Sequence, residues 1–334
     1  MTATMPQPIA AANRLVTPAL RQAVDELDPA IGAVIGYHLG WNDAQGRPIQ
    51  PQGGKAVRPS LALLSAEAVG ARPQVALPGA VAVELVHNFS LLHDDVMDGD
   101  EQRRNRPTVW RQFGVPAAIL AGDALLVLAM DVLGRAGVPA ASRCLAEAVQ
   151  SLISGQCLDL AFPRRQTVAV EECMTMAARK TGALIRCAAR LGGLLGHARP
   201  AQVELLGRYG AHLGLAFQLV DDLLGIRGEP AVTGKPVMAD LRERKKSVPV
   251  TVALNSGKDA GRALARLYAE DDDSEECLRA MAALIDVTGA LAWTERQARH
   301  HVRSAEHCLG RLAPAPQAHA ALYQLAHFVT GRNR

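Results

Sequence analysis

Residues 85–98 read LVHNFSLLHDDVMD, an apolar stretch that ends in a group of aspartates. Its apolar residues recur at helical spacing and neither Pro nor Gly interrupts them, which predicts a helix. On this helix Asp94 and Asp98 are four residues apart and share one face, while Asp95 lies about 100° around the axis. Like charges at this spacing destabilise a bare helix by about 0.2–0.5 kcal/mol, so the pattern indicates a compensating cation.

Magnesium is the cation that this carboxylate pattern favours. It takes oxygen ligands, is held by one or two carboxylates, keeps several waters and shares the rest of its coordination shell with substrate phosphates. The alternative is a solvated helix end that leads into a loop after Asp98, because acidic triplets are common at the surface.

Basic residues flank this segment on both sides. Arg103 and Arg104 follow it, and residues 53–55 (GGK) lie upstream together with Arg58. Arginine binds phosphate through a planar fork, and paired glycines let a backbone approach a ligand closely. A surface lattice of ion pairs and an ordinary loop are the alternatives, since the P-loop pattern is missing. His87 lies on the same helical face as the first aspartate, although a lone histidine is more often structural.

Residues 214–236 read GLAFQLVDDLLGIRGEPAVTGKP, again an apolar helical pattern that ends in an aspartate pair. Two such helices in one chain are hard to explain as surface decoration, and facing each other across a helical bundle they would form one metal-binding mouth. The Gly- and Pro-rich stretch behind the pair, which carries Lys235 and leads to Lys245, has the composition of a mobile lid that excludes water. The alternative for residues 242–246 is a solvated basic face.

The composition fits a helical protein. Of 334 residues 49% are hydrophobic and only 4% aromatic, with many Ala and Leu, which are good helix formers. Helical periodicity prevails, and neither an internal repeat nor an interdomain linker is visible. We therefore predict an all-α fold, a single-domain helical bundle over residues 13–334 that follows a disordered segment at residues 1–12.

The overall charge and the cysteines exclude other classes of protein. A net charge of +3 argues against a nucleic-acid binder or a membrane-surface binder. Six scattered cysteines without a C-x-x-C pair indicate core residues in a reducing compartment. No secretory signal is visible, and Asp123 and Asp131 interrupt the best candidate for a membrane span, residues 115–133. We expect a soluble, cytoplasmic protein with no membrane span and no nucleic-acid partner.

The ordered motifs of the chain resemble those of the trans-prenyltransferases, the head-to-tail isoprenyl diphosphate synthases of the polyprenyl synthetase family. The resemblance runs from about Gly53 to Pro249 and rests on GGKAVRP, HNFSLLHDDVMDGDEQRRNRPT, AGDALL, GQCLDL, KTGAL, FQLVDDLLG and GKPVMADLRERKKSVP. Within the family the chain is similar to short-chain enzymes, particularly geranylgeranyl diphosphate synthases. The resemblance implies an isoprenoid-synthase fold around a central cavity, and a homodimer.

The resemblance also implies a cofactor, substrates and residue roles. The cofactor is Mg²⁺, three ions per active site when diphosphate is bound, and the substrates are isopentenyl diphosphate and an allylic diphosphate (dimethylallyl, geranyl or farnesyl). The residues implied to bind magnesium are Asp94, Asp95, Asp98, Asp221 and Asp222. Contact with the allylic diphosphate is implied for Lys180, Lys235 and Arg103, and binding of isopentenyl diphosphate for Lys55, Arg58, His87 and Arg104. Thr181 and Gln218 would line the reacting centre, and Lys245 would lie near the lid.

The chain departs from the family pattern at three positions. Gly225 stands where the second motif usually has a third Asp, Asn105 stands where Gly is usual, and Trp110 replaces a frequent His. Position 225 lies one helical turn after Asp221, so a ligand or a water partner of the third ion is missing. We expect weaker binding at that site, because Asp221 alone has to hold the ion.

The product length should follow the depth of an apolar cavity below the first motif. Phe89 and Ser90 lie five and four positions before Asp94. In the family, aromatics at both places fit a C15 product, whereas one aromatic at the fifth position with an uninterrupted motif resembles C20 enzymes. We therefore predict a C20 product, geranylgeranyl diphosphate.

Two other functions stay open at the level of the sequence. A class I terpene cyclase shares the all-α fold and an aspartate-rich motif, but it has no need for a second diphosphate site. A non-catalytic or weakly active subunit of a hetero-oligomeric synthase is compatible with Gly225, but the intact first motif argues against it.

Overall fold

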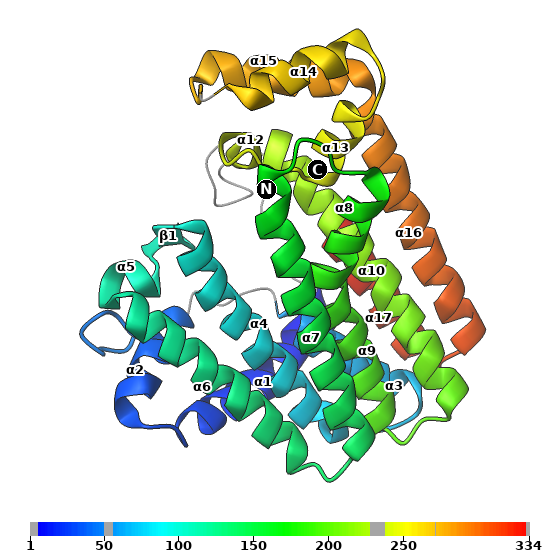
Figure 1. The fold of residues 1–334 in the computed structure, drawn as a ribbon. Helices are drawn as coiled ribbons and strands as arrows, with labels where there is room; N and C mark the ends of the chain where they lie inside the picture. Colours follow the sequence, from blue (N-terminus) through cyan, green and yellow to red (C-terminus); the bar gives the residue numbers. More distant parts are fainter. Residues whose placement is uncertain (1–5, 50–55, 228–237, 271, 332–334) are drawn as a thin grey trace. The chain divides into compact units, whose positions relative to one another are not determined.

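Helices account for most of the computed structural model, which describes residues 6–49, 56–227, 238–270 and 272–331 (Figure 1). Over these residues the paired strands amount to one short hairpin, β1 (Gln102–Arg103) antiparallel to β2 (Arg106–Pro107), beside an isolated bridge between Asn42 and Pro48. The predicted all-α fold is confirmed.

The contacts between residues divide the chain into two compact units. Unit 1 combines Met1–Val149, Cys187–Gly207 and Leu309–Leu325; unit 2 combines Gln150–Arg186, Arg208–Cys308 and Ala326–Arg334. The single-domain organisation predicted for residues 13–334 stays a prediction.

Unit 1 is built around helix α4, which packs along α6 and against α3. Its helices are α1 (Gln7–Val24), α2 (Pro29–His38), α3 (Val57–Ala68), η1 (Pro73–Ala76), α4 (Leu77–Asp98), α5 (Val109–Phe113) and α6 (Val115–Gly134). The apolar face of α4 explains the packing, because Val83, Val86 and Leu92 are fully or almost fully buried.

Helix α1 corrects the expected disorder at the N-terminus, because it begins at Gln7. Ile9 and Ala12 are buried and continue the apolar face that Val16 and Leu20 also supply. Burial of this face gives residues 7–12 the free energy that ordering a terminus requires. Residues 1–5 lie outside the described residues.

Unit 2 contains shorter helices around two buried apolar clusters. Its own elements are η2 (Phe162–Arg164), α8 (Val170–Ala177), the π-helical turn η3 (Ala178–Gly182), α12 (Ala239–Arg242), α13 (Val248–Leu254), α14 (Asp259–Ala269) and α15 (Glu275–Thr288). Five longer helices have residues assigned to both units: α7 (Pro139–Ala161), α9 (Ala183–Leu195), α10 (Pro200–Arg227), α16 (Ala290–Leu312) and α17 (Pro316–Thr330).

Two helical stretches are long and apolar enough to cross a membrane, judged by length and composition alone. They are Pro73–Asp98 and Val115–Gly134, and the bent pair α15–α16 would add a third if it counted as one span. The second stretch is therefore apolar enough for a membrane span even though it contains Asp123 and Asp131. The absence of a membrane span and the cytoplasmic location stay predictions.

Candidate active site

The first aspartate cluster lies at the C-terminal end of α4 in unit 1. Leu77–Asp98 is one continuous helix, so the helix predicted over residues 85–98 is confirmed. Asp94 and Asp98 lie one turn apart and are partly exposed, whereas Asp95 is buried. Gly99 ends the helix with a φ of 71°, a left-handed conformation that glycine adopts without strain. A rigid helix end thus holds two carboxylates within reach of solvent.

Asp95 is paired with Arg103 of the β-hairpin. Arg103 Nε lies 2.7 Å from Asp95 Oδ1 and Arg103 Nη2 lies 2.6 Å from the same oxygen. Burial alone would lower the pKa of Arg103, but the hydrogen bond and the charge of Asp95 outweigh it and raise that pKa overall. Asp95 therefore anchors the hairpin to α4, and its role as a magnesium ligand stays a prediction.

Two of the three departures from the family pattern lie in the β-hairpin or close after it, and each has a local structural reason. Arg104 and Asn105 have φ values of 53° and 59°. Asparagine tolerates this left-handed region better than most residues, so it can replace the usual glycine. Trp110 has its own partner, because its Nε1 donates a hydrogen bond to the carbonyl oxygen of Asp100 at 2.8 Å.

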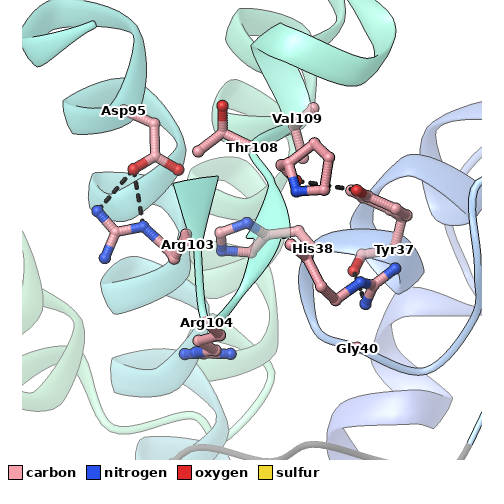
Figure 2. Close-up of a pocket in the computed structure, with 10 residues that line it drawn as sticks. Tyr37, His38, Gly40, Asp95, Arg103, Arg104, Thr108 and Val109 are labelled. Atoms are coloured by element: carbon pink, nitrogen blue, oxygen red, sulfur yellow. Dashed lines mark hydrogen bonds and ion pairs between the residues drawn. The ribbon is translucent and has the colours of Figure 1, made fainter. Parts of the chain in front are cut away.

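A cavity rich in guanidinium groups lies beside the Asp95–Arg103 pair (Figure 2). Figure 2 shows side chains from α2, from α4 and from the hairpin directed toward it. Three arginines against one carboxylate give it an excess of positive charge, which favours an anionic group. It is lined by Tyr37, His38, Gly40, Asp95, Arg103, Arg104, Arg106, Pro107, Thr108 and Val109.

Arg106 is engaged by the protein itself. Its Nη1 donates to the carbonyl oxygen of Tyr37 at 3.2 Å and its Nη2 to that of Asn42 at 3.0 Å. The guanidinium also stacks 4.1 Å from the centre of the Tyr37 ring. Arg106 thus ties the end of α2 and the segment after it to the hairpin, just as Asp95 ties Arg103 to α4.

Two histidines of unit 1 are held neutral near these arginines. Burial, followed by the charges of Arg104 and Arg103, lowers the pKa of His38 to about 3. Burial, followed by the charges of Arg58 and Arg104, lowers the pKa of His87 well below its usual value. The predicted isopentenyl diphosphate residues Arg58, His87 and Arg104 therefore lie close enough to influence one another. Neutral imidazoles can donate a hydrogen bond to an anion without adding charge.

His38 is a site residue that the sequence reasoning missed. It ends α2, far from every motif, and its Nε2 is buried without a hydrogen-bond partner in the part of the chain that the structure describes. Glu84 was missed too: it lies one turn before His87, and its charge raises the pKa of Arg104 against the larger effect of burial. Neither residue carried a local sequence signal, because only the fold brings them to the arginines.

Phe89 and Ser90 lie on α4, as the helical prediction requires. Phe89 is 6% exposed and its ring packs edge-on against His93, with centroids 4.9 Å apart. Ser90 Oγ donates to the carbonyl oxygen of His87 at 2.8 Å. The ring is therefore held rigidly within unit 1, and its role in product length stays a prediction.

Unit 2 holds Lys180 in the π-helical turn η3. Lys180 Nζ lies 2.5 Å from Asp159 Oδ2 of α7, and both side chains are largely shielded from solvent. Gly155 permits the close approach, since a Cβ atom there would lie 2.3 Å from the backbone nitrogen of Lys180. Asp159 belongs to the GQCLDL motif, but its pairing with Lys180 was not predicted.

Thr181, Gln218 and Asp222 form a hydrogen-bonded chain in unit 2. Thr181 Oγ1 donates to Gln218 Oε1 at 2.5 Å, and Gln218 Nε2 donates to Asp222 Oδ1 at 2.6 Å. The backbone nitrogen of Val248 donates to the other Asp222 oxygen at 2.9 Å. Asp222 therefore ties the end of α10 to the start of α13, and its role as a magnesium ligand stays a prediction.

The two aspartates of the second pair differ in their exposure to solvent. Asp221 is exposed, whereas Asp222 is buried. Burial, followed by the charges of Asp240 and Asp221, raises the pKa of Asp222 to about 7. Asp240 was not predicted as a member of this carboxylate group.

The remaining predicted features have different outcomes. Lys245 Nζ lies 2.6 Å from Glu243 Oε2 in unit 2. Lys55, Lys235 and the lid stretch at residues 228–237 lie outside the described residues. The expectation that the two aspartate motifs face each other stays a prediction, because one belongs to unit 1 and the other to unit 2.

The exposed carboxylates fit magnesium in their chemistry. Asp94 and Asp98 offer oxygen donors one helical turn apart, and Asp221 offers a third that is open to solvent. Over the described ranges no three His, Cys, Asp or Glu side chains already surround one point. An ion that keeps its waters and takes phosphate oxygens needs only one or two carboxylates, so this arrangement suffices when diphosphate is present.

Comparisons with known proteins agree with these features. The polyprenyl synthetase family model matches residues 44–285. The (2E,6E)-farnesyl diphosphate synthase of Mycobacterium tuberculosis is 49% identical over 328 residues, 96% of this chain and 91% of that protein. The geranylgeranyl diphosphate synthase of the same species is 41% identical over 297 residues, 86% of this chain and 84% of that protein.

Solved structures of the same family are also similar to this chain. The crystal structure of a polyprenyl synthetase from Streptomyces coelicolor superimposes with a TM-score of 0.91 at 49% identity and covers 96% of this chain and 98% of that one. The geranylgeranyl pyrophosphate synthase from Corynebacterium glutamicum, complexed with isoprenyl diphosphate and magnesium, has a TM-score of 0.83 at 28% identity and covers 98% and 99% of the two chains. The chain therefore belongs to the polyprenyl synthetase family of prenyltransferases.

Proposed function

We propose that this chain is a magnesium-dependent synthase that condenses isopentenyl diphosphate head-to-tail with an allylic diphosphate and releases pyrophosphate. The observation that carries the proposal is the position of the arginine-lined cavity directly beside the aspartate-tipped end of α4. Oxygen donors for magnesium and guanidinium donors for a diphosphate thus lie together in unit 1. The magnesium seen in the Corynebacterium enzyme supports the choice of ion.

Magnesium, when bound, would neutralise the negative charge that grows on the departing pyrophosphate. Asp94 and Asp98 would hold two ions at the first motif, and Asp221 would hold a third at the second motif. The number of three ions rests on the family resemblance and on the two separate carboxylate sites.

The chain's own residues would bind and orient the two diphosphates. Arg103, fixed by Asp95, and Lys180, fixed by Asp159, would contact the allylic diphosphate with little loss of side-chain entropy, because both are already held in place. Arg58, Arg104 and the neutral His87 would bind the isopentenyl diphosphate. Thr181 and Gln218, which hydrogen-bond each other, would line the reacting centre.

The chemistry needs no nucleophilic side chain. The allylic carbon–oxygen bond breaks and leaves an allylic cation, and the double bond of isopentenyl diphosphate attacks this cation. Loss of a proton to the released pyrophosphate then restores an alkene. Fixed cationic groups around the leaving group lower the barrier because they stabilise charge where it develops.

The product is proposed to be C20 geranylgeranyl diphosphate, because Phe89 is the one aromatic residue of the 89–90 pair. C15 farnesyl diphosphate is the second candidate. It is favoured by a specific observation: of the two M. tuberculosis relatives, the more similar one is named a farnesyl diphosphate synthase.

A homodimer is the proposed assembly, and α6 offers a surface for it. Val115, Ile119, Leu120 and Val127 are all at least 40% exposed on this helix. An apolar face of this kind is stabilised when a second copy of the chain covers it. Leu120→Glu with Val127→Glu should yield a monomer in light scattering, and an unchanged mass would contradict this assembly.

Product analysis tests the proposed activity. The purified chain is incubated with magnesium, isopentenyl diphosphate and dimethylallyl, geranyl or farnesyl diphosphate, and the products are separated by chromatography. Elongation to C20, or to C15 for the second candidate, is the expected result. A failure to elongate any of the three primers would contradict the proposal and favour a non-catalytic subunit, whereas a cyclic hydrocarbon formed from an allylic diphosphate alone would favour a terpene cyclase.

A further inference from the structure

The missing third aspartate of the second motif has a visible replacement. Gly225 follows Asp221 by four residues on α10, so side chains at these two positions would share one face of the helix. A Cβ atom on Gly225 would lie 2.2 Å from Oδ2 and 2.6 Å from Cγ of Asp240. The carboxylate of Asp240 therefore occupies the space that a side chain at position 225 would need.

Packing on both sides of Asp240 holds it there. Its neighbours Met238 and Leu241 are buried in the same apolar cluster as Leu223 and Ile226 of α10. The carbonyl oxygen of Asp240 also accepts a hydrogen bond from the backbone nitrogen of Lys245 at 2.9 Å. The start of α12 is thus fixed against the end of α10.

The Asp240 carboxylate therefore lies about one helical turn after Asp221 along the same face of α10. The carboxylates at this end of α10 comprise two from the motif, Asp221 and Asp222, and one from the segment that follows it, although no three described acidic side chains already surround one point. Such a group of like charges is stabilised by a divalent cation.

We propose that Asp240 supplies, from α12, the third carboxylate that the motif lacks at position 225, and that it positions the magnesium ion together with Asp221. The inference rests on the proposed function. It replaces the expectation that Asp221 alone holds this ion. It also explains why position 225 is a glycine, since any larger residue would push the Asp240 carboxylate away from its place.

Two single variants separate this role from ordinary packing. Asp240→Asn removes the charge and keeps the shape. Gly225→Ala adds no charge and improves helix propensity, yet its methyl group would displace the Asp240 carboxylate. If the close approach serves packing alone, Gly225→Ala should change stability without changing metal binding, whereas the proposed role predicts weaker metal binding in a chain that still folds.

Binding of Mn²⁺ in the presence of inorganic pyrophosphate provides the readout. The full-length chain is titrated with Mn²⁺ while free Mn²⁺ is followed by electron paramagnetic resonance, and folding is checked by circular-dichroism melting. In both variants the dissociation constant of one class of bound Mn²⁺ should rise about 10- to 100-fold, as for other groups that orient a metal site. Asp259→Asn, at an exposed position at the start of α14, is the control and should bind like wild type.

A relocated carboxylate completes the test. Gly225→Asp with Asp240→Ala moves the third carboxylate back to α10 and removes the clash, so its Mn²⁺ affinity should exceed that of Asp240→Ala alone. If wild type binds Mn²⁺ but Asp240→Asn and Gly225→Ala bind like Asp259→Asn, the inference is overturned and the proposed function stands. If wild type with pyrophosphate binds no Mn²⁺, the proposed magnesium dependence itself fails.

Discussion

Asp95 and Arg103 are joined through a single carboxylate oxygen, which lies 2.7 Å from Nε and 2.6 Å from Nη2 of the guanidinium. The Asp95 side chain is 2% exposed and that of Arg103 24% exposed, so solvent screens this pair only weakly. Asp95 therefore carries much of the stability of the β-hairpin.

We expect Asp95→Asn to lower the free energy of unfolding by about 3 kcal/mol, because the variant removes the nearest counter-charge of a largely buried guanidinium. Urea denaturation measures the effect. Asp100→Asn is the control: its carboxylate lies 3.7 Å from the same guanidinium, and we expect a loss below about 1 kcal/mol. Equal losses in the two variants would show that the short contact has no special weight.

Gly155→Ala should disturb the turn that carries Lys180. The added methyl group would meet the backbone nitrogen of Lys180 at 2.3 Å, and backbone cannot move aside as a flexible side chain can. We expect a loss of about 1–3 kcal/mol in unfolding free energy together with a lower kcat.

Gly310→Ala on α16 is the matched control for that variant, since its new methyl group would meet no described atom within 4 Å. It should stabilise the chain by about 0.5–1 kcal/mol, because Ala has the higher helix propensity. If both substitutions change unfolding and kcat in the same direction, the close approach at Gly155 does not matter.

Phe89→Ala should shift the products toward longer chains, because the ring that is held against His93 is removed. Chromatography of the products from a farnesyl diphosphate primer measures the shift. The variant should also cost about 3 kcal/mol of stability, so assays belong well below its melting temperature. Phe113→Ala, an aromatic of α5 that packs on Tyr37, is the control and should leave the product length unchanged.

The stability of unit 2 should depend on pH through His212 and His301, whose Nδ1 atoms lie 3.0 Å apart. Burial, followed by the charges of His212 and His300, lowers the pKa of His301 from 6.5 to about 4. Burial, followed by the charges of His300 and Arg208, lowers that of His212. Below pH 6.5 the unfolded chain binds a proton that the folded chain does not.

The contribution of the pair to stability is thus complete above pH 6.5 and is lost as the pH falls toward about 4. Thermal melting of wild type at pH 7, 6 and 5 should show the loss. His301→Asn keeps a hydrogen-bonding group near His212 but does not titrate, so its midpoint should fall less over this range. An identical fall in both proteins would rule the pair out as its source.

The sequence predicted the elements that carry a periodic apolar pattern. Residues 85–98 form the end of α4 because their apolar face packs on α3 and α6. This packing requires apolar residues at helical spacing, and that spacing is visible in the sequence. Apolar residues at helical spacing are also present in residues 7–12, and the expectation of disorder there was wrong because it overlooked them.

Other features could not be predicted because they arise between segments far apart in the chain. His38 reaches the arginines of the hairpin through the placement of α2, and Asp159 reaches Lys180 across 21 residues. Asp240 lies against Gly225 because its neighbours Met238 and Leu241 pack in the same core cluster as two apolar residues of α10. No local spacing rule contains these contacts, since they depend on how helices pack.

The π-helical turn at Ala178–Gly182 sets a length constraint on the chain. A π turn accommodates one residue more than an α turn, and such turns recur at functional sites. Deletion of Arg179 would let α8 run into α9 as a regular α-helix with its flanking residues in register, but it would move the side chains inside the turn, including that of Lys180. A shorter homologue could then fold well and still present the wrong side chain where Lys180 now meets Asp159. Loss or gain of one residue at this turn is therefore a single change by which a duplicated gene could keep the fold of the protein and lose its catalytic activity.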